Sequence, residues 1–295
     1  MIAICIPTIR PESFDRFKEA WHKLFIKHGV KLVTVWDGEE PMVDCYDYAL
    51  NQSLPSRSLK EVMGKYSKAI VNFNGGVRNL GFAYIAKYLP DVEIILTLDD
   101  DVKPIGDTIR DHLKALGQHV PVSWVSTASE YMRGFPYKIR NEAEVVLSHG
   151  VWEGVADFDA PTQLVKGSHR PVEFPKMPIP KSIYFPMCIM NVAFRRKLLP
   201  YMYQAPLTKE IGRADDIFCG ILAKREIDVR GWAAVTGYAR VHHERESDVY
   251  KNLNLESKTI ELMETFWQGD ESDPYFRVYH DKRVLWNSFL RSLKI

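Results

Sequence analysis

Residues 92–102 read Val92-Glu-Ile-Ile-Leu-Thr-Leu-Asp-Asp-Asp-Val102, an apolar run that ends in three consecutive carboxylates. Such a run is typical of a strand buried in an α/β protein. Side chains two residues apart in an extended chain point to the same side, so Asp99 and Asp101 can converge on one divalent cation while Asp100 faces elsewhere. Hard oxygen ligands suit Mn²⁺ or Mg²⁺, which keep coordination positions for water and phosphate. A solvated acidic loop is the alternative interpretation of this triplet.

Apolar runs and helical periodicities alternate over the first hundred residues. Residues 2–6, 31–36 and 92–98 resemble strands, whereas residues 14–25 and 80–88 carry apolar side chains at helical spacing. This order predicts an α/β fold with a Rossmann-like, mostly parallel central sheet flanked by helices. Ligands of such sheets bind beyond the carboxyl ends of the strands, so we expect the functional residues at that edge.

Polar residues follow the first two predicted strands. Pro7, Thr8 and Arg10 come after the first strand and Asp37 comes after the second, so we expect them to contact the substrate beside the Asp triplet. Asp37 could accept a hydrogen bond from an N–H group of a base such as uracil, although Asp before Gly is also common in turns. Arg78 opens the next predicted helix and could face a diphosphate there, or it could be an ordinary surface arginine.

The pattern is less regular in the rest of the chain. Short strands are predicted at residues 69–73 and 123–127, and residues 129–182 show no clear period. A long irregular stretch in a compact domain is usually functional. Helical patterns return near the C-terminus. We therefore expect one catalytic domain over residues 1–250, with a helical extension over residues 251–295 packed on it.

Composition excludes several classes of protein. The 295 residues include 39 Lys+Arg and 38 Asp+Glu, a formal net charge of +1, whereas binders of nucleic acid or anionic membrane need an excess of positive charge. The four cysteines form no Cys-x-x-Cys pair, and no apolar run is long enough to span a membrane. The apolar start ends at Pro7, which is too early for a signal peptide. We expect a cytoplasmic protein that could act as a homo-oligomer.

Three segments in the middle of the chain are more specific. They are Arg133-Gly-Phe-Pro-Tyr-Lys-Ile-Arg140, Ser148-His-Gly-Val-Trp152 and Asp157-Phe-Asp-Ala-Pro-Thr-Gln-Leu-Val-Lys166. These segments closely resemble the reversibly glycosylated polypeptides, which are the UDP-arabinopyranose mutases best known from plants. Matching segments elsewhere are Pro7-Thr-Ile-Arg10, Phe185-Pro-Met-Cys-Ile-Met-Asn191 and Ile211-Gly-Arg-Ala-Asp-Asp216.

The resemblance implies the GT-A fold of nucleotide-sugar glycosyltransferases and the interconversion of UDP-L-arabinopyranose and UDP-L-arabinofuranose. It also implies a divalent metal, usually Mn²⁺, and reversible glycosylation of an arginine. That arginine opens the family's Arg-Gly-aromatic-Pro segment, here Arg133, and a second arginine, here Arg140, closes it. His243 aligns with a family histidine at a position where GT-A proteins often supply a metal ligand, and only the flanking residues distinguish it from His242.

The chemistry of ring contraction indicates what else is needed. The C1–O bond must break, the ring must open and reclose through another hydroxyl, and UDP must be reattached. Covalent capture would divide this reaction into easier steps, but the guanidinium of Arg133 is protonated and needs a carboxylate to accept a proton. Asp157, Asp159, Asp215 and Asp216 are candidates among which the sequence does not choose. The alternatives are that Arg133 only clamps the diphosphate and that Asp215 and Asp216 only cap a helix.

Aromatic and polar residues complete the expected substrate site. His149 and Trp152 could pack on the C–H groups of the sugar, or they could be ordinary core residues. The other side chains that we expect to line the site are Asp100, Asn191 and Arg213.

Two other functions remain compatible with the sequence. The first is a metal-dependent glycosyltransferase that moves a sugar from a UDP-sugar to an external acceptor. The second is a catalytically silent subunit that binds nucleotide-sugars, which the presence of the Asp triplet, both arginines and His243 disfavours.

Overall fold

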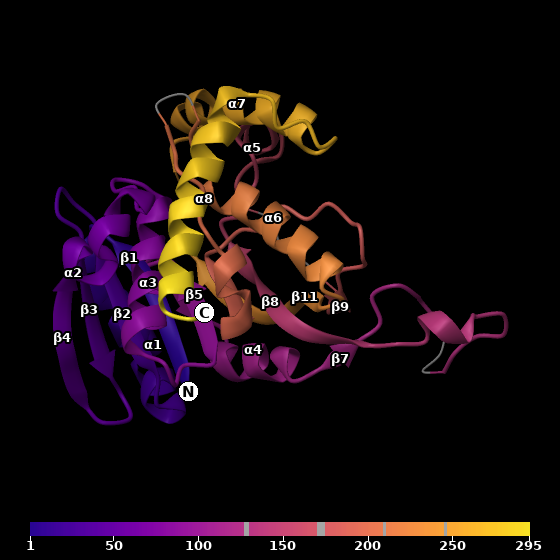
Figure 1. Ribbon diagram of the computed structural model, residues 1–295, viewed down its shortest axis with the longest axis horizontal. Coiled ribbons are helices and arrows are strands. Elements are labelled where there is room, and N and C mark those ends of the chain that lie inside the picture. The colour runs from indigo at the N-terminus through magenta and orange to yellow at the C-terminus, as the bar shows by residue number, and fades with distance from the viewer. Residues whose placement is uncertain (127–129, 170–174, 209–210, 245–246) are drawn as a thin grey trace.

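A mixed β-sheet with helices on both faces forms the structure, which is a computed structural model (Figure 1). It describes residues 1–126, 130–169, 175–208, 211–244 and 247–295. The strands are β1 (Ile2–Thr8), β2 (Lys31–Trp36), β3 (Met42–Asp47), β4 (Gln52–Ser58), β5 (Ile94–Leu98), β6 (Val102–Pro104), β7 (His119–Val120), β8 (Ala143–Gly154), β9 (Met177–Pro178), β10 (Asn191–Arg195) and β11 (Ala233–His243).

The helices follow the strands in an α/β order. The α-helices are α1 (Pro11–His28), α2 (Leu59–Met63), α3 (Arg78–Tyr88), α4 (Thr108–Leu116), α5 (Ala160–Lys166), α6 (Asp215–Val229), α7 (Val249–Phe266) and α8 (Pro274–Ser292). Short 3₁₀ helices are η1 (Gly64–Ala69), η2 (Gly75–Val77), η3 (Tyr137–Ile139) and η4 (Arg196–Tyr201).

The strand order places the first predicted strands at the centre. Within the described residues the order is β4-β3-β2-β1-β5-β10-β8-β11-β6, with β7 beside β8 and β9 beside β11. Strand β1 pairs in parallel with both β2 and β5, and β8 pairs in parallel with β11, whereas β10 is antiparallel to β5 and β8. The predicted α/β class, with a parallel sheet centre between helices, is confirmed.

Alternation along β1 explains why helices cover both faces. Ile4 and Ile6 pack in one apolar cluster with α1 and α4, whereas Ala3 and Cys5 pack in another with α3, α6 and α8. Successive side chains of a strand point to opposite faces, so an all-apolar strand requires a helix layer on each side.

The C-terminal helices pack on the second of these faces. Tyr279 and Trp286 of α8 are buried with ring centroids 6.0 and 5.8 Å from that of Tyr203, and Phe266 of α7 is buried in the same cluster. Among the described residues, no helix combines the length and the apolar character that crossing a bilayer would take.

Three predictions of secondary structure are wrong. Residues 123–126 form no strand, and residue 127, the last of that predicted strand, lies outside the described residues. Residues 69–73 form no strand, because η1 occupies Gly64–Ala69 and a loop follows it. The stretch 129–182 is not irregular throughout, because β8 runs through it as a twelve-residue strand. The polar sequence Ser148-His149-Gly150 interrupts the apolar pattern there, although all three residues are buried on β8, which lies between β10 and β11 in the sheet.

Candidate functional site

The carboxyl ends of β1, β2 and β5 bring several predicted residues together. Thr8 is paired with Trp36, and the amide of Asp37 donates a hydrogen bond to the carbonyl of Thr8. The carboxylate of Asp37 accepts hydrogen bonds from the amides of Gly38 and Phe73, both at 2.9 Å. Burial raises the pKa of Asp37 despite these bonds.

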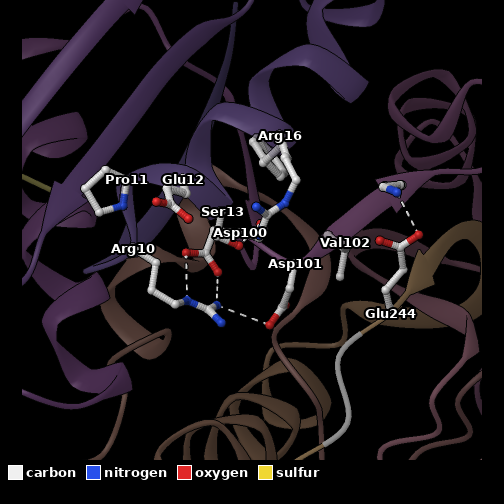
Figure 2. Close-up of a pocket in the computed structure, with 11 residues that line it drawn as sticks. Arg10, Pro11, Glu12, Ser13, Arg16, Asp100, Asp101, Val102 and Glu244 are labelled. Atoms are coloured by element: carbon white, nitrogen blue, oxygen red, sulfur yellow. Dashed lines mark hydrogen bonds and ion pairs between the residues drawn. The ribbon is translucent and has the colours of Figure 1, made fainter.

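Asp100 fixes the loop between β1 and α1. Its carboxylate accepts a hydrogen bond from the hydroxyl of Thr8. The guanidinium of Arg10 donates to the same carboxylate, and the hydroxyl of Ser13 donates to the carbonyl of Asp100 at 3.1 Å (Figure 2). Burial is the main cause that raises its pKa. The side chain expected to bind substrate is therefore occupied in positioning Thr8 and Arg10. These loops border a cavity of about 640 Å³.

Asp101 and His243 face each other across β6 and β11. Nε2 of His243 lies 3.9 Å from Oδ1 of Asp101, and Nδ1 of His243 lies 3.0 Å from the carbonyl oxygen of Val155. That second contact fixes the ring so that Nε2 is directed at the carboxylate, an arrangement typical of metal-binding histidines. The distance exceeds that of a hydrogen bond, and Asp101 also forms an ion pair with Arg10 at 3.2 Å. Of the two histidines, His243 is the one whose ring nitrogen lies near Asp101.

Asp99 does not join that pair. Its carboxylate forms an ion pair with Arg78, whose Nη1 also donates to the hydroxyl of Thr97 at 2.6 Å and to the carbonyl of Ile189 at 3.2 Å. Arg78 is only 3% exposed, and its Nε has no partner in the parts of the chain that the structure describes. No group of three or more His, Cys, Asp or Glu in those parts could hold a metal ion. Arg78 is therefore a buried residue of the site and not a surface arginine.

Two carboxylates at the start of α6 complete the core of this site. Asp215 packs so closely on Gly75 that a Cβ added there would lie 1.8 Å from its Oδ2 atom. Asp216 accepts hydrogen bonds from the amides of Ile189, at 3.1 Å, and Ile217, at 2.9 Å. Burial raises the pKa of both carboxyls, and that of Asp216 lies well above its usual range because Asp215 and Asp157 add repulsion.

Arg213 links this acidic cluster to the C-terminal helices. It lies 3.9 Å from Asp157, 2.8 Å from Glu256 of α7 and 3.2 Å from Asn252. Asp159, by contrast, caps α5 by accepting a bond from the amide of Thr162 at 2.9 Å. Glu256 had no motif around it that could have indicated a place in the site.

Cys188 is a second residue that sequence reasoning did not single out. Burial, with repulsion from Asp157, Asp216 and Asp99, raises the pKa of its thiol well above the usual range. It therefore lies as a neutral thiol among the carboxylates of the cluster. The Phe185–Asn191 segment of the resemblance contains it, but nothing in the residue pattern gave it a role.

His149 and Asn191 are held inside the sheet. His149 lies 2.9 Å from the hydroxyl of Thr236, and burial lowers its pKa to about 3, so the ring is neutral. Its Nε2 and the Nε1 of Trp152 have no partner among the described residues. Asn191 is fully buried and lies 2.8 Å from Nε2 of His112, which makes it a core residue of the sheet and not a surface of the site.

Arg133 and Arg140 lie apart from these residues, on a projection that we call the arginine arm (described residues 121–126 and 130–142). It extends from β7 and the start of β8 away from the rest of the chain (Figure 1). Arg133 is exposed. The guanidinium of Arg140 lies 3.9 Å from the ring centroid of Tyr137 and donates to the carbonyl of Phe135 at 2.9 Å. Arg140 therefore stabilises the arm itself.

Comparisons with known proteins agree on one family. The family described as reversibly glycosylated polypeptide matches residues 1–272. The probable UDP-arabinopyranose mutase 4 of Arabidopsis thaliana is 32% identical, over 93% of this chain and 76% of the relative. The probable UDP-arabinopyranose mutase 1 of Pisum sativum is also 32% identical, over 93% of this chain and 76% of the relative. A crystal structure of A197 from STIV is similar at a TM-score of 0.40 with 8% identity, covering 83% of this chain and 86% of that one, which is too weak a likeness to argue from.

Proposed function

The chain belongs to the reversibly glycosylated polypeptide family, and from that premise we propose that it is a UDP-arabinopyranose mutase with a GT-A-type fold. One observation of the structure carries the proposal. The half-buried carboxylates of Asp99 and Asp215, at the carboxyl edge of the sheet, face Arg78, which is itself buried and charged. Such a site can bind a diphosphate and can also move protons on a sugar.

The proposed reaction begins with departure of UDP. The bond between C1 and the phosphate oxygen breaks, and its electron pair leaves with UDP. A nitrogen of Arg133, having given a proton to a carboxylate, forms a bond to C1. Capture of the sugar in this way keeps it on the protein while UDP is detached.

Ring contraction then occurs on the held sugar. The nitrogen lone pair forms a C=N bond as the ring C1–O bond breaks, and the ring oxygen takes up a proton. The 4-hydroxyl adds to C1 and loses its proton, which closes the five-membered ring. A phosphate oxygen of UDP then bonds to C1 as the bond from C1 to the arginine nitrogen breaks, and the carboxylate returns its proton to that nitrogen. Asp216 suits the proton transfers because burial and repulsion from Asp215 and Asp157 raise its pKa, which favours the protonated carboxyl.

In this proposal Asp101 and His243 would hold a divalent cation, Mn²⁺ before Mg²⁺. The two side chains would supply one oxygen and one nitrogen ligand, and the cation would stabilise negative charge on the departing diphosphate. Asp37 and Thr8 would then border the uridine. The four cysteines are free thiols, which supports a reducing compartment such as the cytoplasm.

The test is incubation of the purified protein with UDP-L-arabinopyranose and Mn²⁺, followed by separation of the nucleotide-sugars. We expect UDP-L-arabinofuranose to accumulate to a constant ratio and to disappear when the metal is chelated. Free UDP together with sugar on an added acceptor would instead indicate a glycosyltransferase. If no UDP-L-arabinofuranose forms with Mn²⁺ or with Mg²⁺, the proposal that the protein is a mutase is refuted.

A further inference from the structure

The arginine arm is a small, self-supporting unit. The ring centroid of Trp124 lies 4.6 Å from that of Tyr131 and 5.9 Å from that of Phe135. The hydroxyl of Tyr131 donates to the carbonyl of Arg140 at 3.0 Å, and Nε1 of Trp124 donates to that of Asn141 at 3.2 Å. The two described segments of the arm are thus held together by contacts among their own aromatic side chains and backbone.

The base of the arm is also fixed. Val120 pairs with Ala143 where β7 meets β8, and the amide of Lys181 donates to the carbonyl of Val122 at 2.9 Å. Bending the arm back along the sheet would break these contacts. The direction in which it leaves the body is therefore a property of the fold.

The strand register shows that the arm leaves the sheet at the edge opposite the carboxylate site of its own chain. Leu98 is paired with Asn191, and Val192 is paired with His149, so the end of β5 lies level with Gly150 of β8. Strands β5 and β8 run in the same direction because both are antiparallel to β10. The arm joins β8 at Ala143, seven residues earlier, which is roughly 23 Å from the level of the Asp triplet.

The arm and the acidic site have complementary chemistry. Arg133 and Lys138 are exposed on the arm, and the ring of Tyr137 beside them is 84% exposed. At the other edge, the side chains of Asp99 and Asp157 are 36% and 31% exposed. An exposed aromatic ring between two cations is typical of a surface that inserts into a pocket of a partner.

We propose that the arginine arm enters the carboxylate site of a second copy of this chain and delivers Arg133 there. The active unit is then a homo-oligomer whose every site combines the carboxylates of one chain with the arm of another. This inference rests on the proposed function, because it gives Arg133 the role of holding the sugar. Arg140 is a positioning residue, since it holds the ring of Tyr137 and the turn at Phe135.

Complementation between two inactive variants tests the proposal. Arg133→Lys keeps the positive charge of the arm but replaces the guanidinium nucleophile by an amine. Asp101→Asn removes the negative charge at that position of the carboxylate site while keeping the shape of the side chain. The two variants are co-expressed with different affinity tags and purified through both. Purification through both tags leaves only mixed oligomers. In a mixed two-fold dimer one of the two sites combines an intact arm with an intact carboxylate site, so we expect about half of wild-type activity. If each chain used its own arm, every site would carry one of the two defects and no activity would return.

A covalent label identifies which chain is used. With UDP-arabinopyranose labelled in the sugar, radioactivity should appear on the Asp101→Asn chain, which retains Arg133, and only when the Arg133→Lys chain is present. Label on neither chain, with both variants folded and assembled, would overturn the proposal. Full activity of Arg133→Lys alone would overturn it too, while leaving the mutase standing. An inactive wild type would point instead to failure of the proposed function.

A measurement of oligomer size tests the contact between the arm and the second chain independently of the reaction. Tyr137→Ala removes the most exposed ring of the arm, and we expect it to shift sedimentation toward the monomer, whereas Val229→Ala, which alters an equally exposed side chain at the end of α6, should not. A wild type that sediments as a monomer at assay concentration would contradict the shared site.

Discussion

Substitution of Gly75 by alanine should displace Asp215 and leave the rest of the protein in place. The backbone of Gly75 is not in the left-handed region, so alanine is tolerated there. Its Cβ would nevertheless meet Oδ2 of Asp215 at 1.8 Å, whereas contacts under 3.0 Å are essentially never seen. The carboxylate oxygen must therefore move by at least about 1.2 Å, and a misplacement of about 1 Å can cost roughly 100-fold in rate.

The assay is kcat/KM for formation of UDP-arabinofuranose, with a thermal melt on the same preparations. Gly38→Ala is the matched control, because an added Cβ there has nothing within 4 Å. We expect Gly75→Ala to lose about 100-fold in kcat/KM and at most about 1–2 kcal/mol of stability, as for overpacking at a partly open site. If Gly75→Ala turns over as Gly38→Ala does, the position of Asp215 has no part in the reaction.

A double-mutant cycle makes the cause explicit. In the background of Asp215→Ala the methyl group at position 75 meets no carboxylate, so Gly75→Ala should have no further effect on kcat/KM. A second loss of the same size in that background would show that Gly75 acts on something other than Asp215, and it would refute the steric argument.

Two further predictions concern buried charges. The pKa of Asp216 is higher in the folded chain than in the unfolded one, so its contribution to stability is fully present below about pH 4 and is lost as pH rises through the folded pKa. Asp216→Asn removes this titration, and its melting temperature should fall less than that of the wild type between pH 4 and pH 7; parallel curves would contradict the assigned direction. Arg78→Met removes hydrogen bonds to Thr97 and Ile189, while the half-exposed Asp99 can return to water, so we expect a loss of about 2–3 kcal/mol in urea unfolding. A loss below about 0.5 kcal/mol would mean that Arg78 makes no net contribution.

The sheet edge was predictable because local sequence determines it. Apolar strands that end in polar residues must place those residues at the carboxyl edge of a parallel sheet, whatever the details of packing. Thr8, Asp37 and the Asp triplet lie there as expected, through the pairings of β1 with β2 and β5. His243 reaches Asp101 because β11 pairs with β6 directly after the triplet.

The direction of each carboxylate was not predictable in the same way. Alternation along an extended chain suggested that Asp99 and Asp101 share one cation, but the chain leaves the strand after Leu98, and β6 begins only at Val102. Asp99 is instead drawn to Arg78, which is buried and needs a counter-ion. Segments distant in the sequence bury the charge of Arg78, and this buried charge sets the orientation of Asp99. The local sequence around Asp99 does not contain that information.

The position of Arg133 shows why a motif does not determine a site. A motif identifies residues that act together, but it does not say whether one chain supplies all of them. Here the register of β8 against β10 and β5 places the arm at the edge opposite the carboxylates. If one reaction needs both the arm and the carboxylates, either the arm refolds toward the site of its own chain or the arm of a second copy enters that site. The aromatic packing of Trp124, Tyr131 and Phe135 stabilises the arm as it stands, and only the second solution keeps that packing intact.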